Sequence, residues 1–337
     1  MRNNELKVFV ITRFGLGQSS KKFYDQELPY FEKLLIKSVL KQKKHINRWI
    51  ILVDINTPKY VIEKISKLIP ENILYIFSHD PFVTGSVMPN ISLVIKDLGV
   101  KNNDKVITIR VDADDMLSDN YISSVNNIIN DDDLINKYKE ISIDATLGVY
   151  FYPIRNKFIK VSKKGYSVQA LYSIFDKNFH SVYDYSHQKL AESVKKNGGF
   201  CCQLNKNDYW IRSMRQHSVT RFGKKIGFLE GRLSLVKNIF KLLFYKFFEN
   251  NTFYRGNTNI DDLSDNFQLS NNLLYFFENL EKNFETKKAN FSPLVNEIIN
   301  TKKVNSPLKV KNILLEMYKF ESDAGKKTNI RNEFYNF

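Results

Sequence analysis

The first 115 residues alternate between two kinds of hydrophobic pattern. Four short apolar and β-branched runs have the length of buried strands. They lie at 6–12, 49–53, 73–77 and 105–111. Three stretches between them carry apolar residues every three or four positions, as on one face of a helix. These stretches lie at 31–39, 61–69 and 91–98. The alternation predicts an α/β fold with a mostly parallel sheet and helices on both faces.

The pattern changes at about residue 141, where strand-like segments become shorter and are interrupted by Pro153 and Asn156. These segments lie at 141–151, 158–161 and 168–175. We expect them to add an antiparallel or mixed part to the sheet. Helices are expected at 186–195 and 208–216.

The last third of the chain has a different character, because aromatic-rich helical segments alternate there with Asn- and Asp-rich stretches. The sequence therefore predicts an α/β domain over 1–228 and a helical C-terminal appendage over 229–337. Within the appendage, 233–248 mixes Leu, Ile and Phe with three lysines. Such a helix can lie on an anionic membrane surface, although amphipathic helices more often pack on their own protein.

The chain is basic, with 51 Lys and Arg against 36 Asp and Glu and a formal net charge of +15. The excess attracts anions such as nucleotide phosphates, lipid phosphates, anionic membrane or nucleic acid. A chain rich in Lys, Asn and Ile can also owe this bias to an AT-rich genome. Nucleic-acid binding is not expected, because the sequence has no zinc-ligand spacing, RNP-like motif or clear helix-turn-helix. It also has no P-loop, G-x-G-x-x-G or G-x-S-x-G element.

The cysteines and the lengths of the apolar runs indicate the compartment of the protein and its association with membranes. The two cysteines, Cys201 and Cys202, are adjacent and would point to opposite faces of a strand, so a disulfide between them is not expected. The apolar run at 8–11 is too short for a signal peptide. No stretch approaches the roughly 20 uncharged apolar residues of a spanning helix. We therefore expect a cytoplasmic protein, with 233–248 as its one candidate contact with the inner membrane face.

Three carboxylates, Asp112, Asp114 and Asp115, follow the strand at 105–111. They lie at its carboxyl end, where open α/β sheets bind ligands. In an extended backbone, Asp112 and Asp114 point to the same side and offer the hard oxygen ligands that Mg²⁺ and Mn²⁺ prefer. A metal there can neutralise the charge on a departing nucleoside diphosphate. The alternative is a cap for a helix near 118–129, and Asp115 suits such a structural role best.

Two more charged side chains end strands at the same predicted edge. Arg13 follows the first strand, where a guanidinium can pair with a nucleotide phosphate or base, or simply lie on the surface. Asp54 follows the strand at 49–53 and can accept hydrogen bonds from a base or ribose. A turn begun by Asp54 before Pro58 is the slightly favoured alternative.

Several of these residues form a set of motifs: Ile11-Thr12-Arg13-Phe14, Arg110-Val111-Asp112-Ala113-Asp114-Asp115, and Trp210-Ile211 with His217. The set resembles the T-R-F, R-x-D-A-D-D and W-L-x(5)-H motifs of the bacterial "putative rhamnosyltransferase" family. The resemblance extends over about residues 1–225. Ile211 replaces the usual Leu, and the C-terminal third has no counterpart.

The resemblance implies a GT-A-like, Rossmann-like fold, with a donor-binding part over about 1–118 and an acceptor part over about 119–228. It also implies a glycosyltransferase that moves a sugar from a nucleotide-sugar donor to a cell-surface glycan or its lipid-linked precursor. The family name alone suggests dTDP-rhamnose as the donor. A metal-dependent nucleotidyltransferase or phosphohydrolase would use the same carboxylates and is the closest rival.

The resemblance also implies roles for individual residues. The donor contacts in these motifs would be Thr12, Arg13, Arg110 and Asp112, and Asp54 joins them from its place at the end of a strand. The Mn²⁺ or Mg²⁺ ligands would be Asp112, Asp114 and His217. In several GT-A enzymes a late His completes the metal coordination, and a hydrogen-bonded structural role for His217 is the equal alternative.

An inverting transfer would need a carboxylate to take the proton of the acceptor hydroxyl. Asp208 is the first choice, because it is expected to begin a helix after the apolar segment 200–204. A helix cap is the somewhat favoured alternative for this residue. Asp176, which follows the strand-like segment 171–175, is the second choice.

Overall fold

The structure is a computed structural model. It describes residues 6–18, 20–80, 84, 88–165, 168–215, 252–267 and 269–289. These residues fall into two compact units. The first contains both β-sheets and extends to Leu273. The second holds, of the described residues, 153–156, 214–215 and 274–289.

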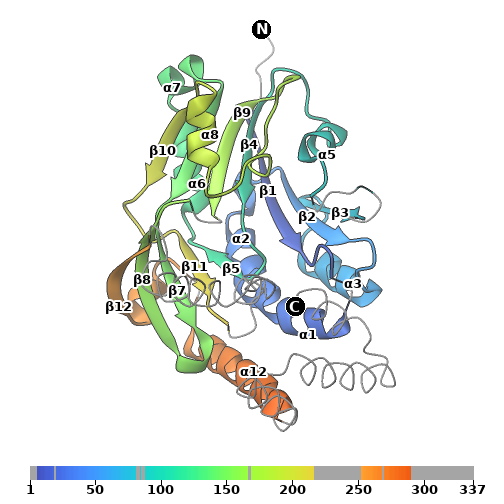
Figure 1. The fold of residues 1–337 in the computed structure, drawn as a ribbon, viewed down its shortest axis with the longest axis vertical. Coiled ribbons are helices and arrows are strands. Elements are labelled where there is room, and N and C mark those ends of the chain that lie inside the picture. Colours follow the sequence, from blue (N-terminus) through green and yellow to red (C-terminus); the bar gives the residue numbers. More distant parts are fainter. Residues whose placement is uncertain are drawn as a thin grey trace, which may run out of the picture. The chain divides into compact units, whose positions relative to one another are not determined.

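The larger sheet has seven strands in the order β10-β6-β9-β4-β1-β2-β3 (Figure 1). They are β1 (Leu6–Phe14), β2 (Arg48–Asp54), β3 (Leu74–His79), β4 (Lys105–Arg110), β6 (Glu140–Ala145), β9 (Gln169–Ile174) and β10 (Phe200–Leu204). Only β9 among them runs antiparallel to its neighbours. The predicted α/β fold with a mostly parallel sheet is therefore confirmed.

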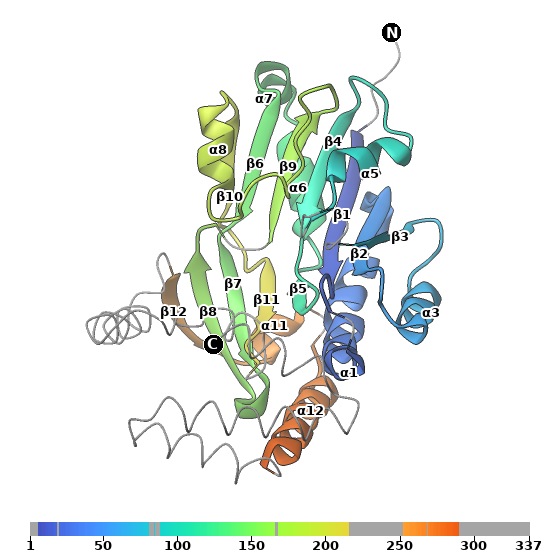
Figure 2. The same cartoon turned by 45° about the vertical axis from the view of Figure 1, so that its right-hand side comes forward.

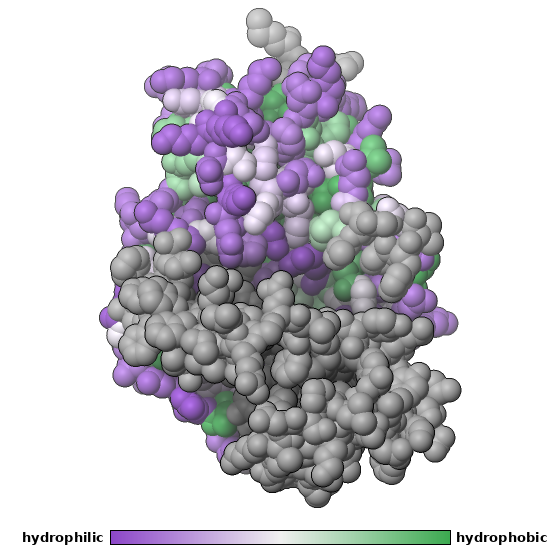
Figure 3. All heavy atoms as spheres, viewed as in Figure 1, coloured by the Kyte–Doolittle hydropathy of each residue, from purple (hydrophilic) through white to green (hydrophobic). Residues whose placement is uncertain are grey.

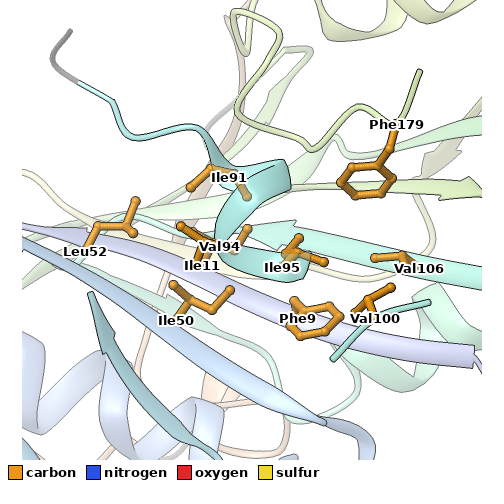
Figure 4. Close-up of a cluster of buried hydrophobic side chains, with 10 residues drawn as sticks. All are labelled: Phe9, Ile11, Ile50, Leu52, Ile91, Val94, Ile95, Val100, Val106 and Phe179. Carbon is orange, nitrogen blue, oxygen red and sulfur yellow. The ribbon is translucent and has the colours of Figure 1, made fainter. Parts of the chain in front are cut away.

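One face of this sheet is covered by α5 (Ile91–Asp97) and α8 (Leu190–Lys196). Figure 4 shows three apolar side chains of α5 packed on Phe9 and Ile11 of β1 and on Ile50 and Leu52 of β2. Two apolar residues of α8 pack against Leu171 of β9. The alternation of apolar residues along these strands gives the sheet an apolar layer under both helices.

The opposite face carries α1 (Lys21–Tyr30), the π-helix η1 (Phe31–Ile36) and α2 (Lys37–Lys41). Phe31 stacks on Phe14 of β1, with ring centroids 4.5 Å apart, and lies 5.9 Å from the Trp49 ring of β2. These three rings are buried. Helices therefore cover both faces, as predicted. Further helices described up to residue 196 are η2 (Lys43–His45), α3 (Lys59–Leu68), α6 (Tyr121–Ile129), α7 (Asp132–Lys137) and η3 (Pro153–Arg155).

A smaller sheet has five strands in the order β12-β8-β7-β11-β5. They are β5 (Asp115–Leu117), β7 (Leu147–Tyr152), β8 (Lys157–Lys163), β11 (Trp210–Ser213) and β12 (Thr252–Thr258). Figure 2 shows this sheet beyond the carboxyl end of β1, with β5 nearest to the larger sheet. The predicted strand-like segment 141–151 is two strands, because the chain leaves the larger sheet at Thr146 and enters the smaller one at Leu147.

Two helix predictions need correction. The segment 208–216 contains strand β11, not a helix, in keeping with the strand preference of aromatic and β-branched residues. Trp210 is fully buried there, and its indole Nε1 donates a hydrogen bond to the Ala145 carbonyl at 2.8 Å. The segment 229–337 is not helical throughout, because β12 pairs antiparallel with β8. The helices described beyond it are α11 (Asp261–Ser264) and α12 (Asn271–Ala289).

The described surface on the face shown in Figure 3 is mainly hydrophilic, with apolar residues in scattered spots. No helix of the described part of the chain is long and apolar enough to span a membrane.

The region after the acidic cluster is fixed by buried polar side chains at the end of the first helical segment. Ser38 Oγ accepts a hydrogen bond from Leu117 N at 3.1 Å. Gln42 is buried, and its Nε2 donates to the Ser118 carbonyl at 2.9 Å. Its Oε1 accepts from Ile122 N at 2.8 Å. These three bonds hold β5 and the start of α6, and therefore the end of the acidic segment, against the helical layer.

Gln42→Leu should destabilise the protein, because it leaves the Ile122 amide without its acceptor, while the Ser118 carbonyl keeps only its bond from Tyr121 N. A buried amide without a partner costs about 1–3 kcal/mol, so urea unfolding should show a loss of about that size. Gln203→Leu makes the same change on an exposed position of β10 and should have little effect. Equal losses in the two variants would contradict the structural role of Gln42.

Candidate functional site

Charged residues follow the parallel strands at the carboxyl edge of the larger sheet. In the register of β1 and β4, Ile11 pairs with Arg110. Arg13 and Asp112 each lie two residues further along, so their side chains share the sheet face of Arg110. Arg13 Nη2 and Asp112 Oδ1 form an ion pair at 3.6 Å. The structure therefore brings these three predicted donor-binding residues together.

Arg110 is a buried cation at this edge, with 6% of its surface exposed. Its Nε has no hydrogen-bond partner among the described residues, and none of their carboxylates forms an ion pair with it. Its guanidinium carbon lies 4.6 Å from the centroid of the Tyr183 ring. A buried cation without an anionic partner is unfavourable. This part of the edge is therefore suited to an anionic ligand.

Protonation states at the edge follow from burial and from neighbouring charges. Burial lowers the pKa of Arg13, but Tyr183 and Asp112 raise it more, so the net shift is upward and the side chain stays cationic. Burial raises the pKa of Tyr183 and outweighs the opposing effect of Arg110 and Arg13. The phenol is therefore protonated at neutral pH, and it donates a hydrogen bond to the Ile11 carbonyl at 3.4 Å.

The same charges shift the pKa of His187, a residue to which the sequence assigned no role. Burial lowers its pKa, Arg110 and two other arginines lower it further, and Asp112 raises it less than these effects combined. The net shift is downward, so the imidazole is neutral at pH 7. A second proton on this ring would add a positive charge to an edge that already carries an excess of them.

Two loops at the edge are anchored by Gln169, the first residue of β9. Gln169 is buried, and its Nε2 donates to the His187 carbonyl at 3.0 Å and to Asp144 Oδ1 at 3.4 Å. The other oxygen of Asp144 accepts from Gly165 N at 2.8 Å. These bonds join the end of β6, the start of β9 and the segment that leads into α8, so the position of His187 is fixed by buried polar contacts.

The predicted metal ligands Asp112 and Asp114 directly follow β4. Ser213 Oγ lies 2.9 Å from the Asp114 carbonyl oxygen and 3.4 Å from Asp114 Oδ2. In the described part of the chain, no three His, Cys, Asp or Glu side chains are grouped to hold a metal. Two carboxylates nevertheless fit Mg²⁺ or Mn²⁺, whose remaining ligands are commonly waters and substrate phosphates. Asp115 is buried in β5 opposite Arg212.

Asp54 is an anchor for the loop after β1. It is buried, and Oδ2 accepts a hydrogen bond from Gly17 N at 2.9 Å. Oδ1 accepts from Asn56 N at 2.9 Å, which forms the turn that the sequence slightly favoured. Both carboxylate oxygens therefore bond to the chain itself, and this arrangement does not support a contact with the donor base or ribose.

Thr12 points away from the charged edge, because neighbouring residues of a strand face opposite sides of the sheet. Its side chain is buried, and Oγ1 accepts a hydrogen bond from the Trp49 indole Nε1 at 3.1 Å. The predicted donor contact of this side chain is therefore replaced by a structural role under the helical layer.

Asp208, the first candidate base, belongs to another part of the molecule. It forms ion pairs with Arg255 Nη1 at 2.6 Å and Lys160 Nζ at 3.5 Å. It does not begin a helix. It precedes Ser213, the neighbour of Asp114, by five positions, and at about 3.3 Å per residue of extended chain this is roughly 16 Å. The structure does not bring Asp208 to the acidic cluster.

Asp176, the second candidate base, lies at the opposite edge of the larger sheet. Strand β9 runs antiparallel to β4, so its last residue, Ile174, pairs with Lys105 at the beginning of β4. Asp176 Oδ1 accepts a hydrogen bond from Asn178 N at 2.7 Å in a local turn. The sequence placed Asp176 after a strand correctly but could not show the direction of that strand.

Two predicted features lie outside the described residues: the candidate metal ligand His217 and the membrane-binding segment 233–248. Sequence reasoning also missed Tyr183, His187 and Arg212. Tyr183 and His187 lie in the irregular segment between β9 and α8, and Arg212 lies in β11, which was predicted as a helix. No periodic pattern or motif therefore marked these three residues.

The chain shows weak similarity to several solved structures. The inositol-1-phosphate CTP transferase of T. maritima matches at 12% identity and a TM-score of 0.35, covering 61% of this chain and 89% of that one. HddC from Yersinia pseudotuberculosis matches at 10% and 0.34, covering 61% and 93%. A "putative nucleotide-diphospho-sugar transferase" from Desulfovibrio desulfuricans G20 matches at 10% and 0.33, covering 71% and 97%. No curated protein matches significantly.

Thr12→Val tests the structural role of Thr12. The change leaves the buried Trp49 Nε1–H without an acceptor and should lower the free energy of unfolding by about 1–3 kcal/mol. Nucleoside diphosphate binding, measured by calorimetry where the variant is folded, should be unchanged. Thr12→Ser keeps the hydroxyl and should behave as wild type. A weaker affinity at unchanged stability would show instead that the Thr12 side chain contacts the donor.

A family match gives the chain its classification. The family described as "Putative rhamnosyl transferase" matches residues 21–225, which is more than half of the 337 residues. The matched range includes the acidic cluster after β4, together with Tyr183 and His187, and it begins after Arg13. The chain therefore belongs to this rhamnosyl transferase family and is a glycosyltransferase.

Proposed function

We propose that the protein transfers a sugar from a nucleoside-diphosphate donor to a hydroxyl of a cell-surface glycan or its lipid-linked precursor. The observation that carries this proposal is the buried Arg110 guanidinium, which lacks an anionic partner among the described residues. It lies at the carboxyl edge of a mostly parallel sheet, where such folds bind ligands. The family supports the class of reaction.

The diphosphate of the donor is the anion that this edge would bind. Arg110 and Arg13 come from neighbouring strands and share one face, so two planar guanidinium groups are available to phosphate oxygens. As the bond to the sugar breaks, negative charge grows on the departing diphosphate. Cationic groups that are already in place stabilise this charge without reorganising.

Asp112 and Asp114 would hold Mn²⁺ or Mg²⁺ together with the diphosphate, and His217 is the proposed third side-chain ligand. A bound ion would supply further positive charge to the departing group. Asp112 also pairs with Arg13, so the same carboxylate would orient the Arg13 guanidinium and bind the metal ion.

The identity of the sugar and the location of the acceptor complete the proposal. The family name favours rhamnose, with dTDP-rhamnose as the donor. A lipid-linked acceptor would require the protein to approach a membrane, and the segment 233–248 is the proposed contact with anionic lipid. Because surface charge attraction is screened within about 10 Å at 0.1 M salt, such contact should weaken as salt rises.

Asp114→Asn tests the proposed metal role. Donor affinity, measured by calorimetry with the nucleotide sugar that supports turnover, should require Mn²⁺ or Mg²⁺ and should fall about 10- to 100-fold in the variant. Asp133→Asn, at an exposed position in α7, is the matched control and should bind as wild type does. Equal affinity in metal and in chelator, for wild type and both variants, would exclude the metal role.

The donor is identified by a screen of nucleotide sugars for release of nucleoside diphosphate. Release of nucleoside monophosphate and sugar 1-phosphate in its place would favour the rival phosphohydrolase. Formation of pyrophosphate from a nucleoside triphosphate and a sugar 1-phosphate would favour the nucleotidyltransferase. A glycosyltransferase must give nucleoside diphosphate together with a lengthened acceptor glycan.

A further inference from the structure

The segment between β9 and α8 crosses the face of the larger sheet that carries Arg13 and Arg110. Ser92 Oγ of α5 donates a hydrogen bond to the Phe179 carbonyl at 3.4 Å. Val182 N donates to Thr108 Oγ1 of β4 at 2.9 Å. These bonds hold the segment over the middle of the sheet, so the next residue, Tyr183, has a fixed position over the ends of β1 and β4.

The ring of Tyr183 contacts both arginines. The guanidinium carbon of Arg110 lies 4.6 Å from the ring centroid and that of Arg13 lies 5.7 Å from it. Both distances are within the range of cation–π attraction. The hydroxyl donates to the Ile11 carbonyl at 3.4 Å, which ties the ring to the strand that ends in Arg13.

This contact has an electrostatic consequence. Two positive charges are brought to one ring, and in the described part of the chain Asp112 forms its ion pair with Arg13. The Nε atoms of Arg13 and Arg110 are both buried without hydrogen-bond partners among the described residues. An aromatic face attracts a guanidinium without using its N–H donors, which point outward from the carbon in the guanidinium plane. The ring can therefore hold both cations and leave to a ligand the donors of Arg110 and those of Arg13 that face neither Asp112 nor the Tyr183 hydroxyl.

We propose that Tyr183 is a positioning residue that holds Arg13 and Arg110 side by side, ready to bind the diphosphate of the donor. The inference rests on the proposed function, because the ring acts through the two arginines and does not itself contact the diphosphate. Preassembly removes part of the entropy that the two long side chains would lose on binding. The ring, rather than the hydroxyl, carries the effect.

A merely structural role for Tyr183 makes a different prediction. A ring that only fills space would affect unfolding and leave ligand affinity unchanged at temperatures where the protein is folded. Tyr185 provides the comparison, because it lies two residues away, packs against His180 with ring centroids 5.2 Å apart, and approaches neither arginine closely enough for a ring contact.

The test measures the dissociation constants of inorganic pyrophosphate and of dTDP, UDP, GDP and ADP by calorimetry on the full chain, together with the melting temperature. Tyr183→Met and Tyr183→Leu remove the ring, and Met keeps much of the volume with a flexible side chain. Both should raise the dissociation constants about 3- to 30-fold. Tyr183→Phe keeps the ring and should stay within about twofold of wild type. Tyr185→Leu should lower the melting temperature without changing affinity.

The outcomes separate this inference from the proposed function. Wild-type affinity in a folded Tyr183→Met or Tyr183→Leu variant would overturn the positioning role while leaving the diphosphate site intact. An equal loss in Tyr183→Phe would overturn it too, because the hydroxyl would then carry the effect. If wild type bound neither pyrophosphate nor any of the four nucleotides, the diphosphate site itself would be refuted.

Discussion

The parallel register between β1 and β4 is the constraint on which the site depends. Because Ile11 pairs with Arg110, the residues two positions further on, Arg13 and Asp112, reach the same level of the same face. A shift by one residue would send either side chain to the opposite face, under the helical layer that buries Thr12. The pairing of β1 with β4 therefore brings Arg13 and Arg110 together, and neither strand alone could place both arginines at this edge.

Buried polar side chains hold the loops at this edge of the sheet in place. Asp54 holds the loop after β1, Gln42 holds the chain after the acidic cluster, and Gln169 holds the loop before α8. Each one forms a hydrogen bond from its buried side chain to a backbone group of the segment that it holds. Fixed loops keep the charged groups in place before a ligand arrives, which is the arrangement that electrostatic stabilisation of a departing diphosphate requires.

The hydrophobic period and the ends of the strands predicted the α/β class, the mostly parallel sheet and the edge where Arg13 and Asp112 meet, whereas the role of Arg110 came from the family resemblance. The sequence did not predict β11, since the aromatic run around Trp210 fits either a strand or a helix. The sequence also did not show the direction of the strand before Asp176. Asp176 follows a strand as expected, but β9 runs antiparallel to β4 and therefore ends at the opposite edge of the sheet. Tyr183 reaches the site only through long-range packing of an irregular segment, which no local pattern encodes.

The central claim is that the buried Arg110, which has no anionic partner among the described residues, binds the donor diphosphate. Calorimetry of nucleoside diphosphate binding to Arg110→Gln tests it most directly. Loss of a charged hydrogen-bond donor should weaken binding about 10- to 100-fold. Arg48→Gln makes the same change at the beginning of β2, at the opposite edge of the sheet, and should bind as wild type does. Wild-type affinity in a folded Arg110→Gln variant would contradict the account.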